Sequence, residues 1–299
     1  MKCLVTGGAG FIGSNLALEL SRRGHDVTVL DNLSFGHEQN LKGFKGAFVR
    51  GDVANAEVVR GLKGGFDVIF HQAAITDPRY PDASETLRQN VQGFQYALEL
   101  AARDEAKLVY ASTASLYGNG ASPQREDQPK ELLSAYAQSK LIMDEMASHH
   151  FSERHVVGLR YFNVFGQHEE HKGRPASMIY HLAKQMKAGQ KPRIFKMGEQ
   201  KRDHIFVKDC VLANLAALDA PSGVYNVGTG VGTSFKELVS LLNSTLGTAL
   251  EPEYFDMPYD PKTYQMNTQA DIRRASGLLG FKAEYDLKRA LTEYVPTVS

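Results

Sequence analysis

A tyrosine and a lysine stand four residues apart at Tyr136 and Lys140. On a helix, this spacing places the phenol and the ammonium on the same face. A free phenol titrates near pH 10 and is a poor base at neutral pH, but a neighbouring cation favours its phenolate. The pair can therefore move a proton to or from a substrate hydroxyl. The alternative is an ordinary surface pair, because the same spacing is common by chance.

Three glycines near the start of the chain, Gly7, Gly10 and Gly13, have the spacing of a phosphate-binding turn. They follow an apolar run and precede a helical segment, so the backbone can turn tightly and approach a pyrophosphate. The N–H groups at the start of such a helix attract phosphates. Asp31 lies 18 residues beyond Gly13, where its carboxylate can accept ribose hydroxyls. We interpret the segment as a dinucleotide site; a purely structural turn is the alternative.

Short apolar runs alternate with helical segments through the first half of the chain. The runs are β-branched or aromatic without polar alternation, which is typical of strands buried on both faces; they lie at residues 3–5, 27–30, 47–49, 68–70, 108–110 and 155–159. Helices are expected at 15–23, 54–62, 83–102 and 135–149. This alternation predicts an α/β fold of the Rossmann type, a doubly wound parallel sheet with right-handed crossovers.

The pattern changes past residue 165, where charged and glycine-containing loops separate shorter helices. These are expected at 175–187, 209–218 and 235–246. Ser234 and Glu237 have the spacing of a capping box at the start of the last one. We assign residues 1–165 to a dinucleotide-binding domain and residues 166–299 to a smaller α/β substrate domain. No linker-like stretch separates them, so the boundary is soft and segments of the two can interleave.

Composition narrows the class of protein. Lys and Arg number 34 and Asp and Glu number 34 in 299 residues, and this balance argues against a nucleic-acid binder, which needs a basic surface. Two cysteines, Cys3 and Cys210, are too few for a disulfide scaffold or a thiolate zinc site. No run reaches the roughly 18 apolar residues of a membrane span, and the N-terminus leaves no room for the apolar region of a signal peptide. We expect a cytoplasmic protein with no membrane partner.

The motifs, in their order along nearly the whole chain, resemble the extended short-chain dehydrogenase/reductase family of nucleotide-sugar epimerases and dehydratases. The matching segments are residues 6–13, 51–53, 71–74, 112–118, 136–140, 160–166, 202–203 and 226–230. The resemblance implies that Tyr136 is the acid/base, Lys140 its partner and Thr113 the hydroxyl beside the reacting carbon, with Ser112 and Ser115 as alternatives to Thr113. It also implies a cofactor site made of Gly7, Gly10, Phe11, Ile12, Gly13, Asp31, Asn32, Asp52, Val53, Gln72, Ala73, Ala74, Asn90, Tyr136 and Lys140.

Segments of the second half are similar to a narrower group, the ADP-L-glycero-D-manno-heptose 6-epimerases. These segments are residues 171–173, 176–177, 181, 195, 201–203, 264–265 and 268–271. In that group the lysine that matches Lys172 is the second acid/base. The resemblance implies that the nucleotide-diphosphate sugar binds to Thr113, Asn163, Arg174, His181, Phe195, Arg202 and Tyr264. Arg174 departs from the group, which has a small polar residue there, and the loop after Asp31 differs as well.

These residues predict an enzyme that removes a hydride from a carbinol carbon of a nucleotide sugar and returns it to the opposite face. A UDP-hexose 4-epimerase of the same fold is the main alternative. A 4,6-dehydratase is disfavoured, because Ala114 rather than an acidic residue follows Thr113. A non-catalytic NAD-binding protein is disfavoured by the presence of Thr113, Tyr136 and Lys140 together.

NAD is expected as the cofactor in preference to NADP. Asp31 offers an acceptor for a ribose hydroxyl, and Glu38 would repel the 2′-phosphate of NADP. His37 or Arg50 can compensate for that repulsion, so NADP stays open.

Two further expectations concern metals and assembly. The segment 168–171 reads His-Glu-Glu-His, but its histidines are three apart and do not form the zinc motif His-Glu-x-x-His. We therefore expect a solvated acidic loop and no metal. We also expect a homo-oligomer, in which the long helices at 83–102 and 135–149 can pair across a two-fold axis.

Overall fold

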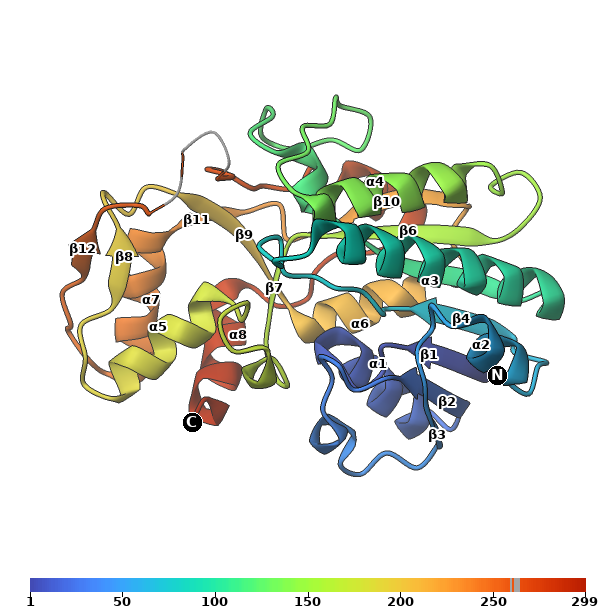
Figure 1. Ribbon diagram of the computed structural model, residues 1–299. Helices are drawn as coiled ribbons and strands as arrows, with labels where there is room; N and C mark the ends of the chain where they lie inside the picture. The colour runs from blue at the N-terminus through green and yellow to red at the C-terminus, as the bar shows by residue number, and fades with distance from the viewer. Residues whose placement is uncertain (259, 261–263) are drawn as a thin grey trace.

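The chain forms two lobes, a larger one around a parallel sheet and a smaller one that carries the C-terminus (Figure 1). The computed structural model describes residues 1–258, 260 and 264–299. None of the helices in this described part is long and apolar enough to cross a bilayer.

The larger lobe contains a seven-stranded sheet in the order β10-β6-β5-β4-β1-β2-β3, with every pair of neighbours parallel. Its strands are β1 (Lys2–Thr6), β2 (Asp26–Asp31), β3 (Ala47–Arg50), β4 (Val68–His71), β5 (Lys107–Thr113), β6 (Val156–Tyr161) and β10 (Gly223–Val227). The six strands predicted in the first half are all present. The order reverses between β1 and β4, and such a switch point opens a crevice at the carboxyl ends of the strands.

Helices cover both faces of this sheet, so the predicted Rossmann-type fold is confirmed. On one face α1 (Phe11–Arg22) packs with α6 (Val207–Ala216); the other carries α2 (Ala56–Gly61), α3 (Ala83–Asp104) and α4 (Ala135–Ser148). The first helix begins at Phe11 rather than at the expected residue 15, because the glycine turn leads directly into it: Gly10 is its extended N-cap residue.

The smaller lobe has its own hydrophobic core between three helices, α5 (Met178–Lys187), α7 (Phe235–Leu246) and α8 (Leu287–Tyr294). Its strands are β7 (Asn163–Phe165), β8 (Arg193–Phe195), β9 (Lys201–Phe206), β11 (Gly232–Ser234) and β12 (Glu253–Phe255). The short helical turns within the described residues are η1 (Glu38–Leu41), η2 (Ala114–Tyr117), η3 (Glu170–Lys172), η5 (Ala275–Leu279) and η6 (Val295–Thr297). Ser234 and Glu237 form the predicted capping box of α7.

Two segments from beyond residue 165 belong to the larger lobe. Strand β10 pairs in parallel with β6, and α6 packs on α1. The halves of the sequence therefore interleave in space, and the division into domains at residue 165 stays a prediction.

A buried ion pair fixes α4 to the sheet. The Arg160 guanidinium of β6 donates to the Asp144 carboxylate of α4 at 2.9 Å, with side-chain exposures of 5% and 6%. Tyr110 donates its hydroxyl to the other carboxylate oxygen at 2.9 Å, and Arg160 also donates to the Tyr117 hydroxyl at 3.1 Å. A pair of opposite charges can be accommodated in the protein interior when each charge also makes further hydrogen bonds, as these two do. The helix that carries the Tyr136 and Lys140 pair is thereby held in register with β5 and β6.

Substitution of Asp144 by alanine is expected to lower the free energy of unfolding by about 3–5 kcal/mol, because it leaves the Arg160 charge buried without its partner. The measurement is urea-induced unfolding followed by circular dichroism. The control is the double variant Asp144→Leu/Arg160→Met, which removes both charges and should cost less than the single change. A single variant as stable as the parent would contradict this account of the pair.

Candidate active site

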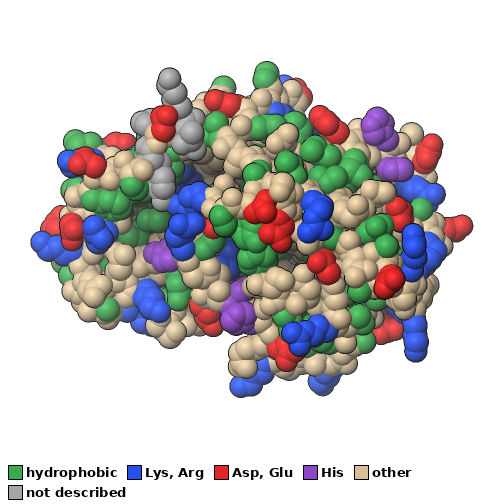
Figure 2. Space-filling view, in the orientation of Figure 1, with side chains coloured by type: hydrophobic (Ala, Val, Ile, Leu, Met, Phe, Trp, Pro, Cys, Tyr) green, Lys and Arg blue, Asp and Glu red, His purple; other side chains and the backbone are tan. Residues whose placement is uncertain are grey.

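A cavity of about 1410 Å³ lies between the two lobes, and its lining takes in residues that follow β1, β2, β4, β5 and β6. Figure 2 shows the surface hollowed between the lobes, with charged side chains of both signs near the hollow. Every residue assigned from the sequence to cofactor, substrate or proton transfer lines this cavity, from Gly7 in the first turn to Tyr264 in the smaller lobe. The structure therefore brings together in one place all the predicted positions.

The glycine turn forms the floor of the cavity at the switch point. A Cβ on Gly13 would lie 2.1 Å from the Gly7 carbonyl oxygen, and a Cβ on Gly7 would lie 2.6 Å from the Ala73 nitrogen. Gly7 also has a φ of +66°, a region that favours glycine. Only a backbone without side chains fits here, and it leads directly to the N–H groups at the start of α1. This cradle fits a dinucleotide pyrophosphate.

Asp31 is held rigidly at the end of β2. Its carboxylate accepts hydrogen bonds from the Ala9 N–H at 2.9 Å and from the Leu33 N–H at 2.8 Å, one on each oxygen. Burial raises the pKa of Asp31, and these two hydrogen bonds act in the opposite direction. Each oxygen keeps acceptor capacity, so the carboxylate is oriented to receive ribose hydroxyls from the cavity.

The other expected cofactor residues lie around the same crevice, and several of them make hydrogen bonds to other residues of the protein. Asn90 of α3 accepts from the Ile75 N–H at 2.8 Å and donates to the Ile75 carbonyl at 3.0 Å and to Ser139 at 2.9 Å. Asn90 thus holds the loop that follows β4. Gln72, on that loop, donates to Asn214 at 3.0 Å. The remaining members line the cavity at Ile12, Asn32, Asp52, Val53, Ala73 and Ala74.

Tyr136 and Lys140 project from the first turns of α4, whose N-cap is Ser134. The Lys140 ammonium donates to the Ala111 carbonyl at 2.8 Å and lies 5.9 Å from the centre of the Tyr136 ring. Burial lowers the pKa of Lys140 to about 8 and raises the pKa of Tyr136 to about 12, while a hydrogen bond with Thr113 lowers the latter. The phenol therefore depends on added positive charge to ionise near neutral pH.

The structure distinguishes Thr113, Ser112 and Ser115, the three residues expected as candidates for the hydroxyl beside the reacting carbon. Thr113 hydrogen-bonds Tyr136, whereas Ser115 is bonded to Thr113 by its N–H at 3.1 Å and its hydroxyl at 3.2 Å. The Ser112 hydroxyl is buried and has no partner among the described residues. Of the three hydroxyls, that of Thr113 is therefore the one that contacts the phenol.

An arginine and two aromatic rings form the wall of the cavity in the smaller lobe. The Arg202 guanidinium lies 5.1 Å from the centre of the Tyr264 ring and donates to the Met266 carbonyl at 2.9 Å. Phe195 meets Tyr264 edge to face at 5.7 Å. Asn163 and His181 line the cavity nearby. A guanidinium beside aromatic rings is suited to a nucleotide, because the cation can bind the diphosphate and the rings can stack on the base.

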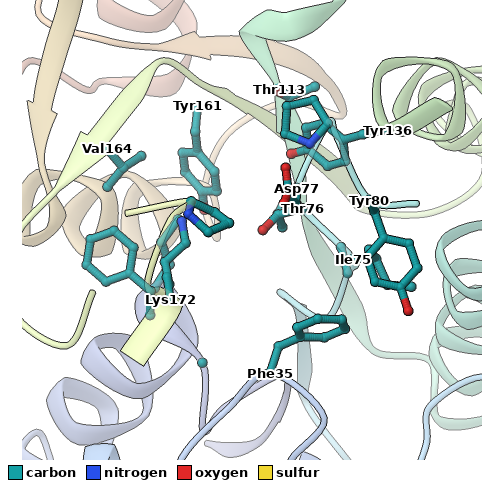
Figure 3. Close-up of a pocket in the computed structure, with 18 of the residues that line it drawn as sticks. Phe35, Ile75, Thr76, Asp77, Tyr80, Thr113, Tyr136, Tyr161, Val164 and Lys172 are labelled. Carbon is teal, nitrogen blue, oxygen red and sulfur yellow. The ribbon is translucent and has the colours of Figure 1, made fainter. Parts of the chain in front are cut away.

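Lys172 enters the cavity from the opposite side to Tyr136. Figure 3 shows its side chain facing Thr113 and Tyr136 across the open space. It lies in η3, with its ammonium 5.5 Å from the centre of the Phe11 ring. Burial lowers the pKa of Lys172, and the nearby carboxylates of Glu169 and Asp77 act in the opposite direction. Two ionisable groups, the Tyr136 phenol and the Lys172 amine, thus flank one space.

The expectation of a solvated acidic loop at residues 168–171 was wrong for Glu169. This side chain is 1% exposed, and its carboxylate accepts from the Gly166 N–H at 2.9 Å and from the Ser177 hydroxyl at 3.0 Å and N–H at 2.6 Å. It closes the loop of residues 166–177 into a fixed shape. His168 is bonded to Ser14 at 3.0 Å, and no cluster able to hold a metal occurs among the residues described.

Sequence reasoning missed a second contributing loop, residues 75–80, between β4 and α3. Thr76, Asp77 and Tyr80 line the cavity, and Asp77 accepts from Arg174 at 3.3 Å. Tyr80 meets Phe35 edge to face at 5.9 Å. No motif marks these residues; the only signal is that they follow a strand end at the switch point.

The fold and the site define a dinucleotide-dependent enzyme with a tyrosine and a lysine placed for proton transfer. The chain belongs to the NAD dependent epimerase/dehydratase family, whose model matches residues 3–228. An ADP-L-glycero-D-manno-heptose-6-epimerase of Brachyspira hyodysenteriae is 37% identical over 290 residues, which are 92% of this chain and 91% of that one.

Solved structures agree with this assignment. The ADP-L-glycero-D-manno-heptose-6-epimerase of Helicobacter pylori is 38% identical, with a TM-score of 0.94 over 99% of this chain and 96% of that one. A UDP-glucose 4-epimerase of Thermotoga maritima, solved with UDP-glucose, is 29% identical with a TM-score of 0.89 over 99% and 98% of the two chains.

Proposed function

We propose that the protein is a nucleotide-sugar epimerase that interconverts the C6 epimers of an ADP-glycero-manno-heptose. The observation that carries the proposal is the position of Tyr136 and Lys172 on opposite sides of one cavity (Figure 3). Inversion of a carbinol centre needs a proton to leave one face and a proton to arrive on the other. Bound NAD supplies the hydride acceptor and donor for the same carbon and adds positive charge near the phenol.

Tyr136 acts first in one direction of the reaction. Its phenolate, favoured by the Lys140 ammonium, removes the proton of the substrate hydroxyl while Thr113 orients that hydroxyl. Burial raises the pKa of this phenol to about 12, so its phenolate is a strong base once the nearby positive charge has allowed it to form. The fixed position of α4 keeps this chemistry on one side of the cavity.

Lys172 serves the opposite face. Once the oxidised substrate presents the opposite face of its carbon, the oxygen of that carbon would lie near the Lys172 ammonium, which donates the second proton to it. Burial lowers the pKa of this lysine, so its ammonium is a stronger acid than an exposed one. The alternative role is a contact with a phosphate of the nucleotide.

The nucleotide end of the substrate is assigned to the smaller lobe. Arg202 offers charge to the diphosphate, Tyr264 and Phe195 offer ring faces and edges to the base, and Asn163 and His181 add polar groups. This arrangement leaves the sugar between Tyr136 and Lys172.

The direct test is incubation of the purified protein with ADP-D-glycero-D-manno-heptose, followed by proton NMR of the product. We expect conversion to the C6 epimer without loss of mass. Turnover of UDP-glucose to UDP-galactose instead would establish the 4-epimerase alternative, which the similarity to the Thermotoga enzyme favours. Loss of water would indicate a dehydratase, and no conversion of either sugar would favour a non-catalytic protein.

We propose NAD rather than NADP as the bound cofactor. Asp31 is fixed by two backbone N–H groups with acceptor capacity toward the cavity, and Glu38 opens the adjacent turn η1. A 2′-phosphate would meet the Asp31 carboxylate, whereas Glu38, expected to add to the repulsion, is exposed and does not line the cavity. Mass spectrometry of the cofactor released from the purified protein should show mainly NAD, and a majority of NADP would overturn this choice.

Substitution of Tyr136 by phenylalanine should lower kcat by at least about 10²-fold, because it removes the group that exchanges the first proton. Nucleotide-sugar affinity should change little, since the ring remains. Steady-state kinetics and calorimetric titration measure the two quantities. Tyr96→Phe on α3, outside the cavity, is the matched control. Near-normal turnover in the Tyr136 variant would remove this residue from the mechanism.

Substitution of Lys172 by methionine separates its two possible roles. An acid/base lysine predicts a collapse of kcat with substrate affinity retained, whereas a phosphate contact predicts mainly a higher KM. Lys236→Met serves as the control, because Lys236 is exposed and pairs with Glu199 outside the cavity. Epimerisation at the parent rate under saturating substrate would exclude the two-base mechanism.

A further inference from the structure

An ion pair crosses the cavity beside Lys172. The Arg174 guanidinium, from the loop of residues 166–177, donates to the Asp77 carboxylate at 3.3 Å, from the loop of residues 75–80. The Asp77 side chain is 18% exposed and the Arg174 side chain 66%. One partner follows β4 of the larger lobe and the other precedes α5 of the smaller lobe, so the contact joins the two sides of the cavity.

We propose that Asp77 and Arg174 are a charge-balancing pair that sets the protonation of Lys172 for the second proton transfer. In this role both are positioning residues, because they act through Lys172; the substrate contact that the resemblance implies for Arg174 is a separate prediction. The proposal rests on the proposed function in one respect, namely that Lys172 exchanges that proton.

Asp77 is placed to influence the lysine directly. Figure 3 shows its carboxylate pointing into the cavity, in the space between Lys172 and the Thr113 and Tyr136 side. The charges of Asp77 and Lys172 interact attractively. The Arg79 N–H donates to Asp77 at 2.9 Å, which fixes the direction of the carboxylate.

The other charged groups around Lys172 come from several elements and do not compensate for this pair. Glu169 is attracted to the lysine as well, but its oxygens already accept three hydrogen bonds from Gly166 and Ser177. The remaining titratable or charged groups that face this region are His168, Glu170 and His171 of its own loop, His37 after β2, Arg79 beside Asp77, His181 of α5 and, across the cavity, Tyr136.

Sharing of Asp77 between Lys172 and two arginines, Arg174 at 3.3 Å and Arg79 at 3.9 Å, has a definite electrostatic consequence. A carboxylate with no other partner would hold the Lys172 ammonium firmly, and a firmly held ammonium is a poor acid. Arg174 draws part of that negative charge to itself and so weakens the hold on the lysine. A reversible epimerisation requires the lysine both to give and to take a proton, which is most efficient when its two states are close in free energy.

The pair makes two predictions of opposite sign. Asp77→Asn removes a negative charge and should lower the pH at which the Lys172 amine is half ionised by about one unit. Arg174→Gln removes a positive charge and leaves Asp77 with the Arg79 guanidinium, at 3.9 Å, as its arginine partner, so the same midpoint should rise by about half a unit. If the two residues had only a structural role, both substitutions would disturb the site in the same way, and the Lys172 midpoints would not move in opposite directions.

The measurement is competitive acetylation of the NAD-loaded protein across a pH range, with the Lys172 peptide quantified by mass spectrometry. It needs no substrate and no turnover. Arg174→Lys keeps the charge and should restore the parent midpoint. Arg22→Gln, which makes the same change at the exposed end of α1, should leave it unmoved. The double variant Asp77→Asn/Arg174→Gln should fall between the two single variants.

Kinetics then separate the two proposals. In the direction in which Lys172 donates its proton, the alkaline limb of kcat/KM should shift with the acetylation midpoint. Midpoints that move as expected without a matching shift in kcat/KM would uphold the charge balance and contradict the catalytic role of Lys172. Midpoints that stay in place, or move in the same direction in both single variants, would overturn the charge-balancing pair and leave Lys172→Met to test the lysine itself.

Discussion

Backbone contact at the glycine turn is the constraint on which the rest of the site depends. A Cβ on Gly13 would lie 2.1 Å from the Gly7 carbonyl oxygen, so α1 can reach this position only without a side chain there. The same first turns of α1 also hold the loop that carries Lys172: Asn15 donates to the Gln167 carbonyl at 3.0 Å, and Ser14 is bonded to His168. One helix end therefore positions both the glycine turn and the loop that carries Lys172.

The two proton-exchanging groups are supported in different ways. Tyr136 stands on a helix that the buried Asp144 and Arg160 pair fixes to the sheet. Lys172 stands on a loop whose shape depends on Glu169 and its bonds to Gly166 and Ser177. Rigid support on both sides of the cavity keeps the distance between the two groups constant, which a reaction that uses both faces of one carbon requires.

Much of this architecture could be predicted from local patterns in the sequence. The strands β1 to β6 and the glycine turn were predicted because buried parallel strands and tight turns leave short-range signals. Strand β10 was missed, since Gly223–Val227 gains its place only by pairing with β6, far away in the chain. The burial of Glu169 and the contact between Asp77 and Arg174 leave no local signal either, because each depends on loops brought together by the fold.

The placement of β10 at the edge of the large sheet makes the larger lobe depend, during synthesis, on a segment from late in the chain. Asn226 in this strand accepts from the Tyr117 hydroxyl at 2.6 Å and donates to the Gln124 carbonyl at 2.8 Å. A nascent chain that has emerged only as far as β6 lacks the edge strand and these contacts. The larger lobe is thus completed only after most of the polypeptide has left the ribosome, and α7 and α8 of the smaller lobe follow β10 in the chain.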